Sequence, residues 1–150
     1  MRDAILIRKF KAEDKAQLLE ILTENTPKYF AESEIADYAN YLEKEIQDYF
    51  IAQLDDKIIA GAGINYDKEK HLAKISWDIV SPAFHKQGIG SLLLAHRLQH
   101  ISMKKDIKNI IVRTSQLAHQ FYLKKGFKLL ETHKDYWAKG FDMYKMIYNK

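Results

Sequence analysis

The chain has 150 residues, of which 47% are hydrophobic and 29% are charged; these proportions exclude a disordered or fibrous protein and suit one globular domain. Its net charge of +4 comes from 24 lysines and arginines against 20 acids, spread without a long basic run, so it attracts anions only mildly and does not choose between a phosphate-bearing cofactor and nucleic acid. Cysteine is absent, which excludes disulfides, a thiol nucleophile and a thiolate metal site.

The N-terminal third of the chain predicts one strand and two helices. A short strand is expected over Ala4–Lys9, and the apolar run before Arg8 is too short for a secretory signal or a membrane span. We therefore expect a cytoplasmic protein with no membrane partner. Apolar residues at helical spacing then predict one helix over Glu13–Glu24 and a second over about Glu32–Asp48.

An antiparallel hairpin is expected next, with strands over Tyr49–Leu54 and Ile58–Tyr66. Its second strand contains Gly61, Ala62 and Gly63, which carry almost no side-chain bulk. Glycine inside a strand often marks a bulge or a place where another group comes close to the backbone. We expect one of these two features here.

The central strand is expected to end at Val80, because Pro82 follows and lacks a backbone donor. Before it, apolar and polar residues alternate with the period of a half-buried strand. The alternation places Asp78 on one face and four apolar residues on the other, namely Ala73, Ile75, Trp77 and Ile79.

A glycine turn, His85–Gly90, follows this strand and opens a helix with a broad apolar stripe. The first turn of a helix has N–H groups without partners, and glycine lets an anion approach them closely. The helix dipole contributes about 0.3–1 kcal/mol, whereas each hydrogen bond to a charged group contributes about 1.5–3 kcal/mol, so the N–H groups dominate. The turn is not the dinucleotide fingerprint, because Leu93 occupies the position of the third glycine. Taken alone, it fits a sharp turn without a ligand equally well.

The remaining pattern completes a mixed α/β (α+β) domain over residues 1–150. We expect a buried strand over Ile110–Val112, a helix over Gln116–Lys125 with Ser115 as its N-cap, and strands over Phe127–Thr132 and Met143–Tyr148. A loop is expected between these last strands, over His133–Gly140. The order predicts a mixed sheet of about seven strands flanked by about four helices.

Two stretches together resemble the GNAT superfamily of acetyl-CoA-dependent N-acetyltransferases. The segment from Val80 to Gly90, VSPAFHKQGIG, is similar to its acyl-CoA motif, V-x-P-x-x-[QR]-x-x-G-x-[GA]. The segment from Ala118 to Phe127, AHQFYLKKGF, is similar to its second motif, A-x-x-[FL]-Y-x-K-x-G-F. The sequence departs from the family at His85, where Gln or Arg is usual, and at Ser115, where many members have Asn.

The resemblance implies a GNAT-like fold in which the strand ending at Val80 splays from the strand ending at Val112, so that the arm of acetyl-CoA enters between them. The glycine turn would hold the pyrophosphate, and the thioester would lie near Tyr122. The cofactor-binding residues implied in this way are Ile79, Val80, His85, Lys86, Gln87, Gly88, Ile89, Gly90, Ser91, Ser115 and Tyr122.

Acetyl transfer to an amine needs a proton acceptor for the amine and a proton donor for the departing thiolate. The family assigns the donor role to the tyrosine at the position of Tyr122, which could otherwise be a packing residue. Asp78 is the first candidate for the base, although a solvated or salt-bridged strand carboxylate is the more ordinary interpretation. His71 and Glu69 are weaker candidates, and many amines bind already deprotonated.

We therefore expect a direct acetyl transfer from acetyl-CoA to a primary amine of a small molecule or peptide. A non-catalytic acyl-CoA-binding sensor or interaction module of the same fold is the alternative. No ligand spacing predicts a metal site, and Ser91 and Ser115 lack the setting of a hydrolase nucleophile. We expect no nucleic-acid partner, and a monomer or a homodimer.

Overall fold

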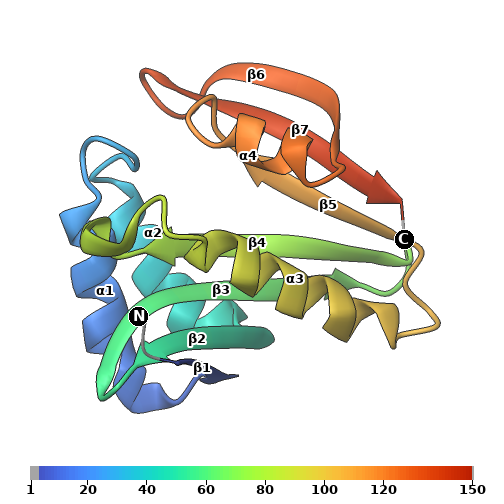
Figure 1. Cartoon of the computed structure of the whole chain (residues 1–150). Helices are drawn as coiled ribbons and strands as arrows, with labels where there is room; N and C mark the ends of the chain where they lie inside the picture. The colour runs from blue at the N-terminus through green and yellow to red at the C-terminus, as the bar shows by residue number, and fades with distance from the viewer. Residues whose placement is uncertain (1–3, 150) are drawn as a thin grey trace.

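A computed structural model describes residues 4–149. Residues 1–3 and residue 150 lie outside the described part; residues 1–3 belong to the N-terminal stretch that is expected not to be a secretory signal. The described chain forms a seven-stranded sheet in the order β1-β2-β3-β4-β5-β7-β6 (Figure 1). Its strands are β1 (Ile5–Lys9), β2 (Asp48–Leu54), β3 (Lys57–Asp67), β4 (Leu72–Val80), β5 (Asn109–Thr114), β6 (Lys128–Ala138) and β7 (Phe141–Asn149). Its helices are α1 (Lys15–Glu24), α2 (Glu34–Asn40), α3 (Ile89–Ser102) and α4 (His119–Lys124).

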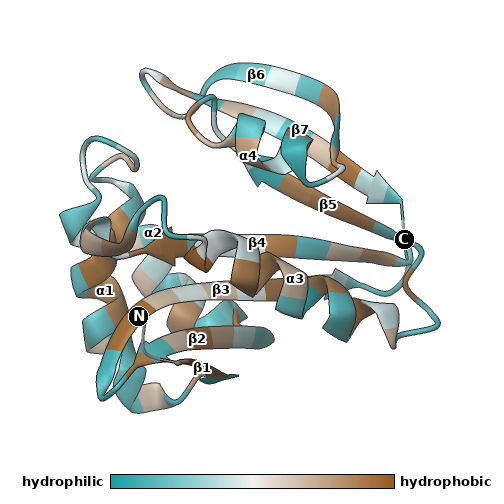
Figure 2. Cartoon of the chain, viewed as in Figure 1, coloured by the Kyte–Doolittle hydropathy of each residue, from teal (hydrophilic) through white to brown (hydrophobic). Residues whose placement is uncertain are grey.

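The helices cover the two faces of the sheet and create two hydrophobic cores. Leu18 of α1 and Tyr38 of α2 belong to one core, which we call the α1/α2 core. Leu93 of α3 and Tyr122 of α4 belong to the other, the α3/α4 core. Figure 2 shows hydrophobic residues along the inner strands, whereas the edge strand β6 is exposed over most of its length. The predicted fold class, a mixed sheet with helices on its faces, is confirmed.

The parallel pair β4–β5 is paired over only part of its length. Its register runs from Leu72 opposite Asn109 to Ile75 opposite Val112. Beyond that point β4 continues to Val80 and β5 to Thr114, and the two strands diverge (Figure 1). All other neighbouring strands are antiparallel. The sheet therefore forks at its centre, as the resemblance implies.

The second helix is shorter than predicted. The α-helix ends at Asn40, a π-helical turn spans Tyr41–Glu45, and the chain is already extended at Ile46. Side chains of β3 hold this turn, since the Tyr41 hydroxyl donates to Asn65 Oδ1 at 2.8 Å and Asn65 Nδ2 donates to the Glu45 carbonyl at 2.7 Å. Tertiary contacts with β3 thus override the helical pattern that continued toward residue 48.

The predicted boundaries near the C-terminus were also wrong. The predicted loop at 133–140 is mostly strand, because β6 continues to Ala138 and turns at Lys139 and Gly140 into β7. Helix α4 begins only at His119, with Ala118 at its N-cap position. Ser115 instead closes a preceding turn, in which its Oγ accepts the Leu117 N–H at 3.2 Å.

Candidate active site

A β-bulge in β4 shapes the centre of the site. Opposite Trp77 and Asp78 the register of β3 shifts between Gly61 and Gly63, so two residues of β4 face one residue of β3. Trp77 has φ of 47°, a left-handed conformation that is rare outside glycine. Such a bulge reverses the alternation of side chains along the strand.

The reversal corrects the predicted face assignment. Ala73 and Ile75 lie in the α3/α4 core, but Ile79 lies in the α1/α2 core with Trp77 packed against it. The four apolar residues therefore do not share a face. Asp78 does lie opposite Trp77 and Ile79, as expected, and its carboxylate is directed toward α3 and α4.

The glycines of β3 make room for Tyr49. A Cβ at Gly61 would lie 2.7 Å from the Tyr49 ring, and one at Gly63 would lie 2.6 Å from it. The ring crosses β3 at these two positions, and its hydroxyl donates to the Trp77 carbonyl at 2.8 Å. Both features expected from the glycines, a close approach and a bulge, are present at this place.

Arg97 of α3 is completely buried and binds Asp78 with both arms of its guanidinium. Nη1 donates to Oδ1 at 2.7 Å and Nη2 donates to Oδ2 at 2.5 Å. Further bonds run to the Gly63 carbonyl at 3.1 Å and the Leu93 carbonyl at 3.2 Å. Sequence reasoning missed Arg97, although its position four residues after Leu93 and four before Ile101 marks it as a charged residue on a buried stripe.

Tyr122 of α4 joins this ion pair. Its hydroxyl donates to Asp78 Oδ2 at 3.2 Å, and its ring packs edge-on against Phe121 and Phe127. Burial raises the pKa of Tyr122 well above its usual value, and the nearby Asp78 charge raises it further. The hydroxyl is therefore protonated across the physiological range and carries a proton that it can donate.

The predicted glycine turn has an open main chain. Lys86 and Gly88 have φ of 61° and 82°, and Gly88 directly precedes α3. A Cβ at Gly88 would meet no heavy atom within 4 Å, and one at Gly90 would come only to 3.6 Å of Phe121. The glycines thus make no room for protein atoms; they leave space beside the first N–H groups of α3, which fits an anion at the backbone.

One cleft of about 1100 Å³ runs from the glycine turn through the fork to Asp78 and Tyr122. It brings together most of the predicted site residues, namely Asp78, Val80, His85, Lys86, Gly88, Ile89, Gly90, Ser91, Ser115 and Tyr122. Ile79 does not line it, because its side chain is buried in the α1/α2 core. Gln87 does not line it either, and its Nε2 donates to the Ala83 carbonyl at 3.2 Å.

His85, predicted to bind the cofactor, contacts the main chain at the end of β4 instead of pointing freely into the cleft. His85 Nε2 lies 2.9 Å from the Val80 carbonyl oxygen, which also accepts a bond from Asn25 Nδ2 at 3.0 Å. The imidazole therefore lies against the strand end. Because the next N–H, that of Ser81, donates to the Ile59 carbonyl on the β3 side, alternation directs the Val80 N–H into the fork.

Beyond the fork the cleft is lined by aromatic side chains from three parts of the chain. The α1–α2 region contributes Tyr29, Phe30 and Tyr41, β4 contributes Trp77, and the β6–β7 hairpin contributes Tyr136, Trp137 and Phe141. The Trp137 indole N–H donates to the Thr114 carbonyl at 3.2 Å and so ties the hairpin to β5. On the same hairpin, Asp142 Oδ1 accepts the Asp135 N–H at 2.9 Å.

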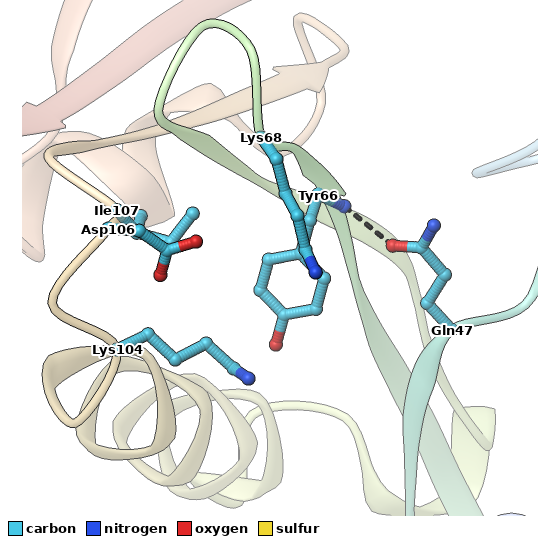
Figure 3. Close-up of a pocket in the computed structure, with 6 residues that line it drawn as sticks. All are labelled: Gln47, Tyr66, Lys68, Lys104, Asp106 and Ile107. Carbon is cyan, nitrogen blue, oxygen red and sulfur yellow. Dashed lines mark hydrogen bonds between the residues drawn. The ribbon is translucent and has the colours of Figure 1, made fainter.

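A smaller hollow of about 460 Å³ lies between the β3–β4 turn and the end of α3 (Figure 3). It is lined by Gln47, Tyr66, Lys68, Lys104, Asp106 and Ile107. None of the predicted site residues lies there. Over residues 4–149 no three metal-ligating side chains gather at one place, and no helix is long and apolar enough to cross a membrane.

The forked sheet, with a glycine turn opening α3 beside it, defines an acyltransferase fold, and comparison with solved structures agrees. A GNAT-family structure from Desulfovibrio desulfuricans superposes with a TM-score of 0.84 at 16% identity, covering 97% of this chain and 99% of that one. An aminoglycoside 6'-N-acetyltransferase complexed with coenzyme A gives 0.76 at 14% identity, covering 96% of each chain. The ribosomal-protein-S18-alanine N-acetyltransferase from Escherichia coli gives 0.78 at 17% identity, covering 97% and 94%.

The family model for the acetyltransferase (GNAT) domain matches residues 13–150. The chain belongs to the GNAT family of acetyltransferases. No curated protein matches it by sequence at a significant level.

Proposed function

We propose that this enzyme transfers an acetyl group from acetyl-CoA directly to a primary amine of a small molecule or peptide. The observation that carries the proposal is the single cleft that connects the glycine turn, the fork between β4 and β5, and the Tyr122 hydroxyl. Acetyl-CoA is an elongated donor with a diphosphate toward one end and a thioester at the other, and it matches the order of these three features along the cleft.

The glycine turn would hold the diphosphate. The N–H groups of Ile89, Gly90 and Ser91 belong to the first turn of α3, where intrahelical partners are lacking. Two or three such bonds to an anion, at about 1.5–3 kcal/mol each, exceed the contribution of the helix dipole. Lys86 adds a positive charge at the same end of the cleft.

The fork would hold the pantetheine arm. Its amides can pair with main chain as an added strand does, and the Val80 N–H is directed into the gap. Ser115 lines the opposite side of the cleft. This arrangement leads the thioester toward Asp78 and Tyr122.

In the reaction, the neutral amine attacks the thioester carbonyl carbon, a carbon–nitrogen bond forms and the carbon–sulfur bond breaks. The sulfur leaves as a thiolate and takes the Tyr122 proton, while the nitrogen loses a proton to Asp78. No cysteine is available to form an acyl-enzyme thioester, which favours direct transfer.

The test is release of free CoA from acetyl-CoA with a panel of amines. The names of the structural neighbours suggest its members: an aminoglycoside and a peptide with an N-terminal alanine, to which we add a polyamine, a free amino acid and a lysine peptide. Turnover with at least one amine, reduced about 100-fold or more in Tyr122→Phe with unchanged acetyl-CoA affinity, is the expected result. Binding of acetyl-CoA without turnover on any amine would instead favour the non-catalytic sensor.

A further inference from the structure

We propose that Asp78 and Tyr122 form a proton relay that carries the amine proton to the departing thiolate, and that Arg97 is the positioning residue that supplies its fixed positive charge. The proposal rests on the acetyl transfer proposed above. It adds a third residue, and it adds direct passage of the proton between the base and the acid.

The three side chains meet at one oxygen atom. Asp78 Oδ2 accepts a bond from Arg97 Nη2 at 2.5 Å and from the Tyr122 hydroxyl at 3.2 Å. Arg97 is completely buried, Tyr122 is 4% exposed, and Asp78 lines the cleft. Tyr122 lines the cleft as well, and Asp78 is the member of the trio that contacts both of the others.

Asp78 is the counter-charge of the buried Arg97 guanidinium. If Asp78 took a proton, Arg97 would be left as a buried cation without its counter-charge, which is strongly unfavourable. That cost disappears if Tyr122 gives up its proton at the same time, because the phenolate then becomes the counter-charge for Arg97. The pairing therefore couples the two proton transfers.

The proton transfers in this scheme balance. The trio begins with Asp78 ionised, Arg97 positive and Tyr122 neutral. The amine gives a proton to Asp78, and Tyr122 gives its proton to the thiolate sulfur. The proton on Asp78 then passes along the existing contact to the Tyr122 phenolate, which restores the starting state. One negative charge moves between Asp78 and Tyr122 while the positive charge of Arg97 stays in place, and no proton is taken from or lost to solvent.

Arg97 is also held in place independently of Asp78. Its Nε and Nη1 donate to the carbonyls of Leu93 and Gly63, which belong to α3 and β3. The guanidinium is therefore fixed by two elements of the fold before it contacts Asp78 on a third. Lysine could supply the charge but not the two-pronged contact.

The first test is a cycle of the variants Asp78→Asn, Tyr122→Phe and the double variant, measured as the single-turnover rate of CoA release with the best amine of the panel. A relay predicts that the double variant is about as slow as the slower single variant, since either change breaks the same chain. Multiplication of the two single effects would overturn the relay.

The role of Arg97 is tested by Arg97→Lys. This variant should lower the single-turnover rate at least tenfold with little change in the KM for acetyl-CoA, and a normal rate would remove Arg97 from the scheme.

The second test uses the unaltered enzyme and does not depend on the folding of any variant. Single-turnover rates are measured in mixtures of H₂O and D₂O. Two protons moving together predict a curved dependence on the deuterium fraction, whereas a straight line would contradict the relay. If the enzyme turns over but the effects of the two single variants multiply, or the rate depends linearly on the deuterium fraction, the relay alone is refuted. If no amine supports turnover, the proposed function is refuted as well.

The matched control is a second two-pronged ion pair, formed by Arg8 and Asp14. Arg8 donates to the Asp14 carboxylate at 2.8 and 2.9 Å, and neither residue lines the cleft. Arg8→Lys should change thermal stability and leave the single-turnover rate unchanged. An equal loss of rate in Arg8→Lys and Arg97→Lys would show that the effect of Arg97 is a general loss of stability.

Discussion

The Tyr49 hydroxyl donates a hydrogen bond of 2.8 Å to the carbonyl oxygen of Trp77, at the bulge of β4. Tyr49 lies on β2, two strands away from β4, and its ring reaches across β3 over the bare backbone of Gly61 and Gly63. The bond supports the left-handed conformation of Trp77, which in turn directs Asp78 toward Arg97 and Tyr122. A residue outside the cleft thereby helps to set its geometry.

Replacing Tyr49 by Phe should lower both stability and turnover. The ring packing stays, but the Trp77 carbonyl and the Tyr38 hydroxyl, which lies 2.6 Å from that of Tyr49, each lose a partner. The expected loss is about 1–3 kcal/mol in the free energy of unfolding, measured with urea. The rate of CoA release should fall because the bulge is less well held.

Tyr38→Phe is the control for that prediction. It removes the contact between the two hydroxyls and leaves the bond from Tyr49 to Trp77 in place. It should therefore lower stability without lowering turnover. Equal turnover in the Tyr49 and Tyr38 variants would show that the bond to Trp77 does not position Asp78.

Alanine at the two glycines of the turn should weaken acetyl-CoA binding. At Gly90 the new methyl group meets only Phe121, at an ordinary contact distance of 3.6 Å, so the fold should tolerate or gain from it. Loss of one or two N–H contacts to an anion, at about 1.5–3 kcal/mol each, corresponds to at least tenfold weaker binding. Calorimetric titration with acetyl-CoA measures the effect.

Gly140→Ala separates this effect from backbone strain. Gly88 and Gly140 have φ of 82° and 85°, and neither has a heavy atom within 4 Å of its added Cβ. Both alanine variants should therefore lose about 1–2 kcal/mol of stability. Only Gly88→Ala should also weaken acetyl-CoA binding, and equal affinities for acetyl-CoA in these two variants would count against the glycine turn as the diphosphate site.

Because of the Arg8–Asp14 pair, the free energy of unfolding should decrease as the pH falls into the acid range. Hydrogen bonds from Arg8 lower the pKa of the Asp14 carboxyl below its usual value, although burial of the carboxyl opposes them. A lowered folded-state pKa contributes stability that is complete above the unfolded-state value and is lost as the pH falls through the folded-state value. Asp14→Asn should therefore lower the free energy of unfolding near pH 7, by about 1–3 kcal/mol for a hydrogen-bonded charge, and the loss should shrink as the pH falls below about 4, measured by urea unfolding. A difference that does not change with pH would contradict this assignment.

The order of elements was predictable because each rests on local periodicity and on turn residues. The strand to Val80, the glycine turn and the start of α3 carry their own signals in sequence: alternation, Pro82 and Gly88. The same holds for the tyrosine of α4, because its surrounding motif is contiguous. Most of the cleft's cofactor end could therefore be assigned from sequence.

The centre of the site could not be assigned from sequence, because it depends on contacts between residues that are distant in the chain. The bulge at Trp77 needs Tyr49 from another strand. Gly61 and Gly63 indicated a bulge or a close approach on β3, but no pattern within β4 marks the extra residue. The pairing of Asp78 with Arg97 joins β4 to α3 across 19 positions. Only the position of Arg97 on an apolar helical stripe hinted at a buried charge, and a buried charge requires a partner.

In the proposed enzyme, the N–H groups of the glycine turn hold the diphosphate of acetyl-CoA. Calorimetric titration of the unaltered protein with acetyl-CoA and with S-acetylpantetheine, which lacks the diphosphate, tests it most directly. We expect acetyl-CoA to bind at one site per chain and at least about 100-fold more tightly than the truncated compound, as two charge-assisted hydrogen bonds require. No binding of acetyl-CoA, or equal affinity for the two compounds, would contradict the account.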